Sequence, residues 1–258
     1  MNTSARDLRV LVTAGAAGIG RAFAETFADA GAKVFVCDVD DNALSAFRAA
    51  RPGIVGIVAD VAVPAAVDAM FGAAAAHLGG LDVLINNAGI AGPTAAVEDI
   101  SVADWDRTIA VDLNGMFYCT RRAVPLLKAA GGGSIINLSS VAGRLGFRLR
   151  TPYSAAKWAV VGFTKSLAIE LGPANIRVNA IQPGIVEGER MDRVIKAKAA
   201  ALGVTEDEFQ AELLSSVSLH KMVTAQDVAN MALFLATPAG ASISGQALSV
   251  CGNVEFMR

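Results

Sequence analysis

Residues 8–20 read Leu8-Arg-Val-Leu-Val-Thr-Ala-Gly-Ala-Ala-Gly-Ile-Gly20. The run up to Thr13 is apolar and rich in branched side chains, which is typical of a buried strand. Three glycines then lead into a helical pattern over 19–30 that ends at Gly31. Glycines between a strand and a helix let the backbone approach a pyrophosphate and place it at the helix N-terminus. The stretch therefore predicts a dinucleotide-binding turn; a glycine turn packed for structural reasons is the alternative.

The same alternation of strand and helix continues along the chain. Strand patterns cover 8–13, 33–37, 54–58, 83–86, 134–138, 176–181 and 247–250, and helical patterns cover 19–30, 41–50, 64–78, 103–130, 152–171, 189–217 and 225–236. This order predicts an α/β fold: a doubly wound, mostly parallel Rossmann-type sheet of about seven strands with helices on both faces. No linker or low-complexity tract interrupts it, so we expect one domain over 1–258.

Composition excludes several classes of function. The 258 residues carry a net charge of −2, which gives no reason to expect nucleic acid or an anionic membrane as partner. No apolar run has the length of a membrane span, and residues 1–7 contain no apolar signal-peptide core. The three cysteines lie far apart in apolar surroundings and no cluster has the spacing of metal ligands. We expect a cytoplasmic protein with reduced thiols and no metal.

Asp38 ends the second predicted strand, and this position bears on cofactor choice. A carboxylate there can accept hydrogen bonds from the adenosine ribose hydroxyls and repels a 2′-phosphate. No basic residue interrupts the glycine-rich turn, and Val39 follows the aspartate. The sequence therefore predicts NAD rather than NADP as the cofactor. The alternative is that Asp38 serves only as a turn or helix-capping residue.

Tyr153 and Lys157 stand four positions apart in a predicted helix, so their side chains share one face. An ammonium beside a phenol stabilises the phenolate. A phenol tuned in this way can exchange a proton with an alcohol or a ketone. Alone the pair is a weak signal, because a tyrosine and a lysine at this spacing are usually only neighbours. The residues that follow the predicted strands strengthen the interpretation, because ligands of such sheets bind beyond the strands' carboxyl ends.

With these motifs in place, nearly the whole chain resembles the short-chain dehydrogenase/reductase family. The family's Thr-Gly-x-x-x-Gly-x-Gly turn corresponds to 13–20, with Ala14 in place of the first glycine. Its Asn-Asn-Ala-Gly stretch corresponds to 86–89, its Ser and Tyr-x-x-x-Lys to Ser140 and 153–157, and its Pro-Gly to 183–184. The resemblance implies cofactor contacts from Thr13, Gly15, Ala17, Gly18, Ile19, Gly20, Asp38, Asp60, Val61, Asn87, Ala88, Gly89, Tyr153, Lys157, Pro183, Gly184 and Ile185.

The resemblance also implies catalytic roles. Ser140 would hydrogen-bond the substrate oxygen, and Tyr153 would donate or accept the proton. Lys157 would support the tyrosine and hold the nicotinamide ribose. Asn114, in Asp112-Leu-Asn-Gly, matches the family's catalytic asparagine, which would steady a water linking the lysine to solvent. The expected reaction is hydride transfer between NAD(H) and a secondary alcohol or ketone: a small polar hydroxy compound such as a hydroxy acid, polyol or sugar derivative.

Two regions bear on the identity of the substrate without determining it. Gly188 stands where the family often carries a threonine that holds the nicotinamide carboxamide, and about 187–218 is expected to form a substrate lid. Arg144, Arg150 and Arg190 lie in segments that border the substrate pocket in the family. Their density suggests a substrate with a carboxylate or another anionic group. The alternative, which we favour at this point, is that these side chains are solvated or form ion pairs between subunits.

Two predicted helices, over 103–130 and 152–171, are apolar on more than one face, and in the family these helices form a dimer interface. We therefore expect a homotetramer. Two other classes of function are weighed against the dehydrogenase: a non-catalytic dinucleotide-binding or sensor protein on this fold, and a different chemistry such as methyl transfer or sugar epimerisation. The intact Ser140, Tyr153, Lys157 and Asn114 argue against the first. The glycine spacing, the Asn-Asn-Ala-Gly stretch and the lack of a separate substrate domain argue against the second.

Overall fold

A single parallel sheet of seven strands forms the centre of the protein, in the order β3-β2-β1-β4-β5-β6-β7. The structure, a computed structural model, describes residues 4–254. The strands are β1 (Arg9–Thr13), β2 (Lys33–Asp38), β3 (Val55–Val58), β4 (Val83–Asn86), β5 (Gly133–Leu138), β6 (Ile176–Pro183) and β7 (Ala247–Val250). The helices are α1 (Gly18–Asp29), α2 (Asp41–Ala50), α3 (Pro64–Leu78), α4 (Val102–Ile109), α5 (Gly115–Ala129), α6 (Thr151–Leu171), α7 (Glu189–Leu202), α8 (Glu206–Ser215) and α9 (Ala225–Ala236). The doubly wound α/β fold expected from the sequence is confirmed.

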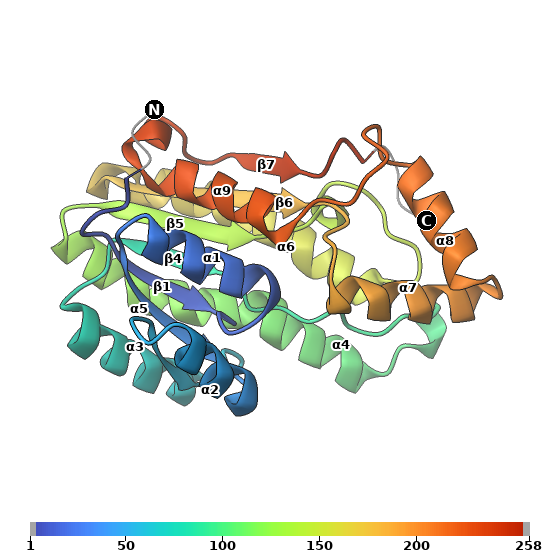
Figure 1. The fold of residues 1–258 in the computed structure, drawn as a ribbon, viewed down its shortest axis with the longest axis horizontal. Coiled ribbons are helices and arrows are strands. Elements are labelled where there is room, and N and C mark those ends of the chain that lie inside the picture. Colours follow the sequence, from blue (N-terminus) through green and yellow to red (C-terminus); the bar gives the residue numbers. More distant parts are fainter. Residues whose placement is uncertain (1–3, 255–258) are drawn as a thin grey trace.

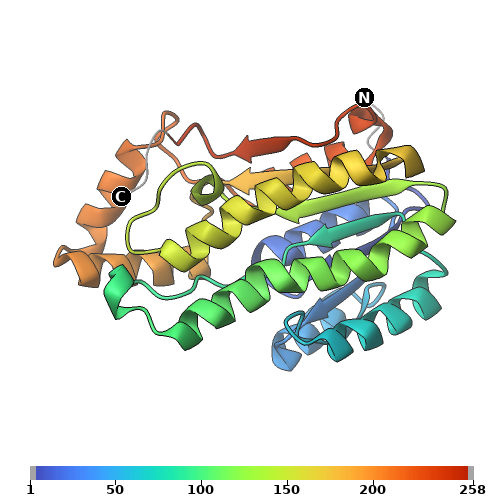
Figure 2. The same cartoon turned by 180° about the vertical axis from the view of Figure 1, so that it is seen from behind.

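Helices cover the sheet on both faces because successive strand residues point to opposite sides. In β1, Val10 and Val12 pack into one core with α1, α2 and α9, whereas Leu11 packs into a second core with α3 and α5. All three side chains are fully buried. Figure 1 shows α1 and α9 on the first face, and Figure 2 shows α5 and α6 across the second. Burial on both faces explains why the strands read as continuous apolar runs.

The chain reverses its direction of winding at β1, which pairs with β2 on one side and with β4 on the other. In sheets of this kind a crevice opens at such a switch point, beyond the carboxyl ends of the strands. The turns after β1 and β4 therefore lie next to each other at this edge. In Figure 1 the strand arrows point toward α7 and α8, which lie beyond the same edge. The fold places the predicted motifs around one crevice.

The segment expected to form a lid consists of two helices instead of one continuous helix. Gly203, with φ 70°, ends α7 in the left-handed conformation, and Thr205 begins α8 with a reciprocal capping box to Glu208. A third apolar cluster lies beneath the two helices and includes Ile195, Phe209 and, from the loop after β6, Ile185. This cluster attaches the segment of α7 and α8 to the carboxyl edge of the sheet.

The long helical stretch expected over 103–130 is interrupted. A π-helical turn, Ala110–Asn114, separates α4 from α5. Such turns insert an extra residue and shift the helical register, and they are frequent at functional sites. Side chains before and after the turn therefore do not follow one helical repeat.

None of the helices within residues 4–254 is long and apolar enough to cross a membrane. The same part of the chain holds no group of three or more His, Cys, Asp or Glu side chains that could bind a metal ion.

Candidate functional site

The glycine-rich turn after β1 is hydrogen-bonded to the turn after β4. The Thr13 hydroxyl accepts hydrogen bonds from the backbone N–H groups of Asn87 (3.0 Å) and Ala88 (2.9 Å). In return, the Asn87 side-chain amide donates to the carbonyls of Thr13 and Ala14, each at 3.0 Å. These four bonds hold two predicted motifs, 74 residues apart in sequence, in one rigid unit.

Two glycines of this turn are required by close packing. A Cβ on Gly20 would lie 1.8 Å from the Ala14 carbonyl oxygen, and one on Gly15 would lie 2.7 Å from Val36. Gly18 differs, because it has φ +52° and nothing within 4 Å of a Cβ, so its surroundings are open. Ala14, the departure from the family pattern, adopts φ 50°, a conformation that suits glycine better than alanine.

Asp38 turns its carboxylate toward the glycine-rich turn. One oxygen accepts from the backbone N–H of Ala16 (3.1 Å) and the other from that of Asp40 (3.2 Å), and the residue is buried. The neighbouring exposed side chains are the uncharged Ala17 and Val39. A separate residue, Asp40, caps α2 by accepting hydrogen bonds from two backbone N–H groups. Asp38 is therefore not the cap of α2, although its bond to the Asp40 N–H is a local turn contact of the kind that the alternative interpretation included.

Asp60 and Val61 follow β3 at the same edge. Asp60 accepts hydrogen bonds from the Ala62 N–H (2.9 Å) and from the Arg107 guanidinium (3.0 Å), which ties this turn to α4. Val61 is buried against Gly115, where an added Cβ would lie 2.7 Å from the valine side chain. The two residues form a fixed wall that links the third strand to the start of α5.

The turn after β5 holds Ser140 in place at the start of a short 3₁₀ turn, where its hydroxyl accepts a hydrogen bond from the Ala142 N–H (3.1 Å). Its neighbour Ser139 donates to the Lys157 carbonyl (2.8 Å). Gly143 lies so close that a Cβ would be 2.5 Å from the same carbonyl. The serine turn is therefore packed directly against the helix α6 that carries Tyr153.

Lys157 is almost completely buried, with 3% of its surface exposed. Its ammonium donates to the Leu138 carbonyl (3.0 Å), lies 3.4 Å from a carboxylate oxygen of Asp112 and lies 5.5 Å from the centroid of the Tyr153 ring. The lysine is thus fixed between the end of β5 and the phenol. Tyr153 and Lys157 share one face of α6 as their spacing predicted.

Asp112, and not Asn114, is the side chain that meets the lysine. Asp112 is fully buried in the π-helical turn, and its second carboxylate oxygen accepts from the Ile90 N–H (2.7 Å). Asn114 is exposed and makes none of these contacts. The structure therefore places Asp112, and not the predicted Asn114, beside Lys157. Position within Asp112-Leu-Asn-Gly could not show which side chain points inward, because the π-helical turn shifts the helical register.

The turn after β6 closes the site on the side of the lid. Gly184 is required there, because a Cβ would lie 2.7 Å from Cys251. Ile185 is buried, and its carbonyl accepts from the Val223 N–H (2.9 Å). Gly188, the departure from the family's threonine, has φ 125° and ψ 174°, a region that essentially only glycine adopts. The substitution of glycine for threonine therefore removes a hydroxyl and also allows a backbone conformation that threonine does not adopt.

Three cations surround the Tyr153 ring. Besides Lys157, the guanidinium of Arg150 lies 5.3 Å and that of Arg190 lies 5.9 Å from the ring centroid. Burial, and secondarily the charge of Arg190, lowers the pKa of Arg150, whereas Tyr153 and Asp112 act in the opposite direction. Two of the three arginines predicted near the substrate thus meet at the tyrosine.

Arg144, the third predicted arginine, points elsewhere. Its guanidinium donates to the Val254 carbonyl (3.0 Å) and to the Cys251 sulfur (3.6 Å). This side chain therefore braces the C-terminal segment and does not join the cations over Tyr153. Sequence reasoning missed Asp112 as the partner of Lys157, although a carboxylate two residues before Asn114 was visible.

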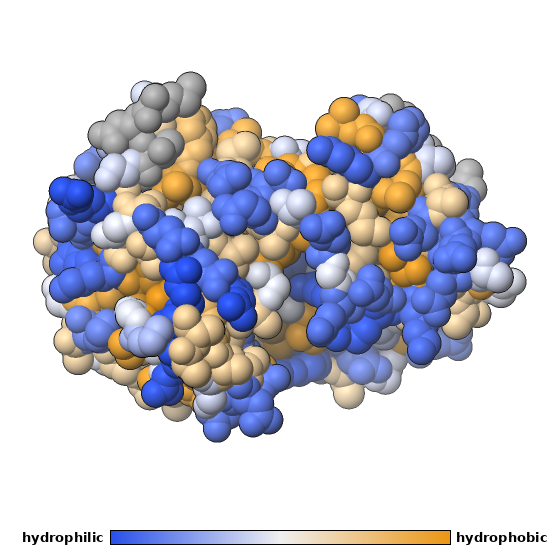
Figure 3. Space-filling view, viewed as in Figure 1, coloured by the Kyte–Doolittle hydropathy of each residue, from blue (hydrophilic) through white to orange (hydrophobic). Residues whose placement is uncertain are grey.

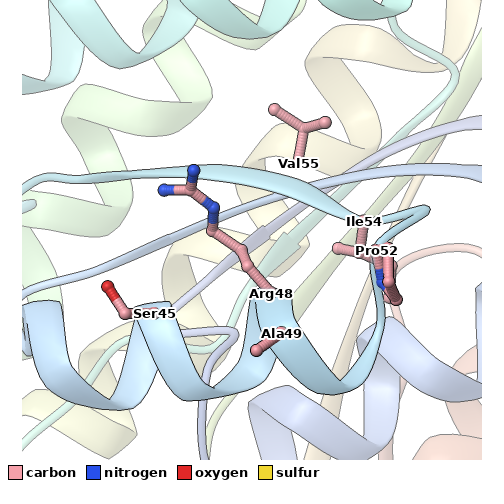
Figure 4. A pocket seen from close by; sticks show the side chains of 6 residues that line it. All are labelled: Ser45, Arg48, Ala49, Pro52, Ile54 and Val55. Atoms are coloured by element: carbon pink, nitrogen blue, oxygen red, sulfur yellow. The ribbon is translucent and has the colours of Figure 1, made fainter.

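The space-filling view shows a hollow with largely hydrophilic borders between the body of the protein and the segment that carries α7 and α8 (Figure 3). A different hollow lies between α2 and the start of β3. Figure 4 shows its lining, which is Ser45, Arg48, Ala49, Pro52, Ile54 and Val55. None of these six residues belongs to the motifs described above, so the second hollow is not the candidate site.

Comparison with known proteins adds a family and close relatives. The sequence model described as enoyl-(acyl carrier protein) reductase matches residues 14–253. Trans-4-hydroxycyclohexanecarboxylate dehydrogenase of Sinomonas cyclohexanicum is 37% identical over 94% of this chain and 91% of its own length. A probable galactose dehydrogenase of Rhizobium meliloti (strain 1021) is 39% identical over 96% of this chain and 95% of its own length.

Solved structures agree with this relationship. A variant of actinorhodin polyketide ketoreductase with NADPH superposes with a TM-score of 0.92 at 32% identity, covering 96% of this chain and 98% of the other. NAD⁺-bound xylitol dehydrogenase superposes with a TM-score of 0.91 at 26% identity, again covering 96% and 98%. The similar structures therefore include complexes with either nicotinamide cofactor.

Proposed function

Because the chain belongs to the short-chain dehydrogenase/reductase family, we propose that it is an NAD-dependent oxidoreductase that interconverts a secondary alcohol and its ketone, with Tyr153 as the general acid/base. The observation that carries this proposal is the buried Lys157, fixed by Leu138 and Asp112 with its ammonium 5.5 Å from the Tyr153 ring. A structural lysine has no need to be buried with a phenol and a carboxylate at the carboxyl edge of the sheet.

The crevice at the switch point suits a dinucleotide. Gly18 leaves open space at the N-terminus of α1, where backbone N–H groups can bind a pyrophosphate. Asp38, whose carboxylate faces the glycine-rich turn, would bind the adenosine ribose, and the turns at Asp60 and at Asn87 border the same edge. When bound, the nicotinamide cofactor supplies the redox chemistry, as hydride acceptor for the alcohol or donor for the ketone. Pro183, Gly184 and Ile185 would line its nicotinamide end.

The protein's own residues then handle the substrate oxygen and its proton. Ser140 would donate a hydrogen bond to that oxygen, and Tyr153 would remove the proton of the alcohol or return it to the reduced ketone. Lys157 would present its ammonium to the phenol, 5.5 Å from the ring centroid. Asp112 acts as a positioning residue, because its carboxylate pairs with Lys157 at 3.4 Å inside the protein.

Substitution of the tyrosine tests the mechanism. Tyr153→Phe removes the acid/base hydroxyl, and we expect turnover to fall by at least about 10²–10⁴-fold while NAD⁺ binding is retained. The chain's other tyrosine offers the matched control, because Tyr118 lies on α5 against Phe117. Tyr118→Phe should leave the rate unchanged. Near-full activity of Tyr153→Phe in an absorbance assay at the nicotinamide band would refute the role, and NAD⁺ binding without turnover by the unmodified protein would favour a sensor.

Cofactor preference rests on Asp38, whose carboxylate faces the glycine-rich turn while Ala17 and Val39 offer no positive charge. We expect kcat/KM to favour NAD⁺ over NADP⁺. Asp38→Ser should narrow this preference by removing the carboxylate that repels a 2′-phosphate. Asp41→Asn, in the first turn of α2, serves as the control. Preference of the unmodified protein for NADP⁺ would contradict the proposal.

The substrate is proposed to be a small polar hydroxy compound. The names of the relatives support this breadth, since one acts on a hydroxycyclohexanecarboxylate and another is a probable galactose dehydrogenase. Lid helices α7 and α8 are proposed to cover the substrate, because their apolar cluster extends to Ile185 beside the catalytic edge. A screen with NAD⁺ over hydroxy acids, polyols, sugars and secondary alcohols tests the class, and activity on none of them would contradict it.

Self-association is proposed from the outer face of α4, α5 and α6. Large apolar side chains are exposed there, namely Trp105, Phe117, Trp158 and Ile169. Ile169 is 82% exposed, which is unfavourable unless another surface covers it. Figure 2 shows α5 and α6 side by side on this face. We expect a homotetramer by light scattering, and Trp158→Glu should weaken it. A stable monomer of the unmodified protein would contradict this expectation.

A further inference from the structure

Arg150 is an unusual residue for its position. It occupies the N-cap position of α6, where the helix dipole favours negative charge, yet it carries a positive one and its side chain makes no capping hydrogen bond. Only 2% of the residue is exposed, and its Nε atom is buried without a hydrogen-bond partner. Its other nitrogens donate to neutral groups, the Ala91 carbonyl and the Thr94 hydroxyl. A buried guanidinium with these surroundings is costly unless an anion compensates its charge.

No carboxylate within residues 4–254 forms an ion pair with it, and Asp112, whose charge favours the guanidinium, is paired with Lys157. Within residues 4–254, neither Arg150 nor Arg190 forms an ion pair, and the single ion pair of the cluster joins Lys157 to Asp112. Arg190 reaches from the first turn of α7 to the Gly89 carbonyl (3.3 Å) and lies over the same tyrosine ring as Arg150. The cluster around Tyr153 therefore carries two positive charges in excess.

The backbone beside Arg150 is built to hold it inward. Leu149 adopts φ 62°, a strained conformation for a branched side chain, and its carbonyl accepts a hydrogen bond from the Ala95 N–H (3.1 Å). The Phe147 ring also contacts the Arg150 guanidinium, at 5.6 Å. Strain of this kind persists where the surroundings hold the residue in place, and it is common at ligand clamps.

From these observations we propose that Arg150 and Arg190 together bind the carboxylate of a hydroxy-acid substrate beside the Tyr153 ring. This inference rests on the proposed oxidoreductase function and names its substrate class. Two guanidinium groups over one acid/base phenol would hold a carboxylate a few bonds from the carbon that is oxidised. Their forked donors match the two oxygens of a carboxylate.

A panel of 2-, 3- and 4-hydroxycarboxylic acids, each paired with its own neutral amide, tests the proposal with NAD⁺ and the full-length protein. For at least one chain length, we expect kcat/KM for the acid to exceed that for the amide by about 10- to 100-fold, the usual effect of charge-assisted hydrogen bonds. Arg190→Gln should reduce this acid-to-amide ratio about tenfold. Arg150→Lys keeps the positive charge but loses the forked donors of the guanidinium, so it should reduce the acid-to-amide ratio by less.

Arg193→Gln is the matched control, since Arg193 lies on the same helix but pairs with Glu189 (3.8 Å) in solvent. It should leave the ratio unchanged. Equal rates for acids and amides in the unmodified protein would overturn the inference while leaving the oxidoreductase proposal intact. The inference would also be overturned if Arg190→Gln lowered kcat/KM equally for acids and amides and weakened NAD⁺ binding, because Arg190 would then bind the cofactor.

A binding measurement separates this inference from the proposed reaction. Butyrate and butyramide can be titrated by calorimetry into the protein with NAD⁺ present. We expect butyrate to bind more tightly and Arg190→Gln to remove the difference. If no hydroxy compound is turned over but this carboxylate preference is seen, the anion site stands and the reaction is wrong. No preference for butyrate would overturn the anion site.

Discussion

Asp112 and Lys157 form an ion pair inside the protein, and neutralising one partner should reveal its strength. Asp112→Asn keeps the size of the side chain and an oxygen for the Ile90 N–H, which donates at 2.7 Å. The substitution removes only the charge that faces Lys157 at 3.4 Å. Lys157 would retain a single fixed partner, the Leu138 carbonyl, while remaining 3% exposed. The cost of the substitution is therefore that of an uncompensated buried ammonium.

The size of the effect follows from the distance. At 3.4 Å and an effective dielectric constant of about 20, the attraction between two unit charges is about 5 kcal/mol. Loss of one partner from buried pairs costs about 3–5 kcal/mol of unfolding free energy, which agrees with this figure. For a protein of this size each kcal/mol lowers Tm by about 2–4 °C, so Asp112→Asn should lower Tm by roughly 6–20 °C.

A double-mutant cycle isolates the pair. Thermal and urea unfolding at pH 7 would be measured for the unmodified protein, Asp112→Asn, Lys157→Met and the double variant. Because the double variant retains neither charge of the pair, its destabilisation should be about 2–3 kcal/mol smaller than the sum of the two single effects. The reasoning would be refuted by additive effects, or by an Asp112→Asn variant that melts within about 2 °C of the unmodified protein.

Three further predictions concern the scaffold. Ala14→Gly should raise Tm by a few degrees, because it relieves a left-handed alanine with φ 50°, whereas Ala22→Gly inside α1 should lower it; a drop for both would contradict this. Burial raises the pKa of Cys37 to about 12, so this thiol should react with a disulfide reagent at pH 8 only after unfolding, and rapid labelling of the folded protein would be inconsistent with that. Burial raises the pKa of Asp82, but hydrogen bonds from the Arg9 side chain and backbone outweigh it and lower the pKa below its ordinary value. The stability from this pair is therefore complete above about pH 4 and lost as the pH falls further, so the acid-induced drop in Tm should be smaller in Asp82→Asn; an unchanged drop would count against the pair.

Local sequence pattern was sufficient to predict the fold of the protein. Runs of branched apolar residues, glycine-rich turns and helical periodicity determine elements over short stretches, so the seven strands and the doubly wound sheet could be read from the chain. The spacing of Tyr153 and Lys157 also lies within one helix, where four residues make about one turn. Each of these features depends on neighbours in sequence, which is why the sequence predicts them well.

Features that depend on distant residues were predicted less well. Asn114 and Asp112 are two residues apart, and only the π-helical turn between α4 and α5 places the carboxylate inward and the amide in solvent. Arg144 and Arg150 are both near Ser140 in sequence, yet the first is bound to the Val254 carbonyl and the second lies over the Tyr153 ring. The number of basic residues in this segment could not show which of the two arginines lies over the Tyr153 ring.

By itself the sequence determined the order of strands and helices, the glycine turn and the candidate Ser140, Tyr153 and Lys157, because each is set by residues close along the chain. The tertiary structure alone decided which charges meet at the phenol. Parallel strands bring their carboxyl ends to one edge, and the loops that follow them converge there from all parts of the chain. The ion pair of Asp112 with Lys157 forms only where these segments pack together. The same packing places Arg150 and Arg190 over one tyrosine ring.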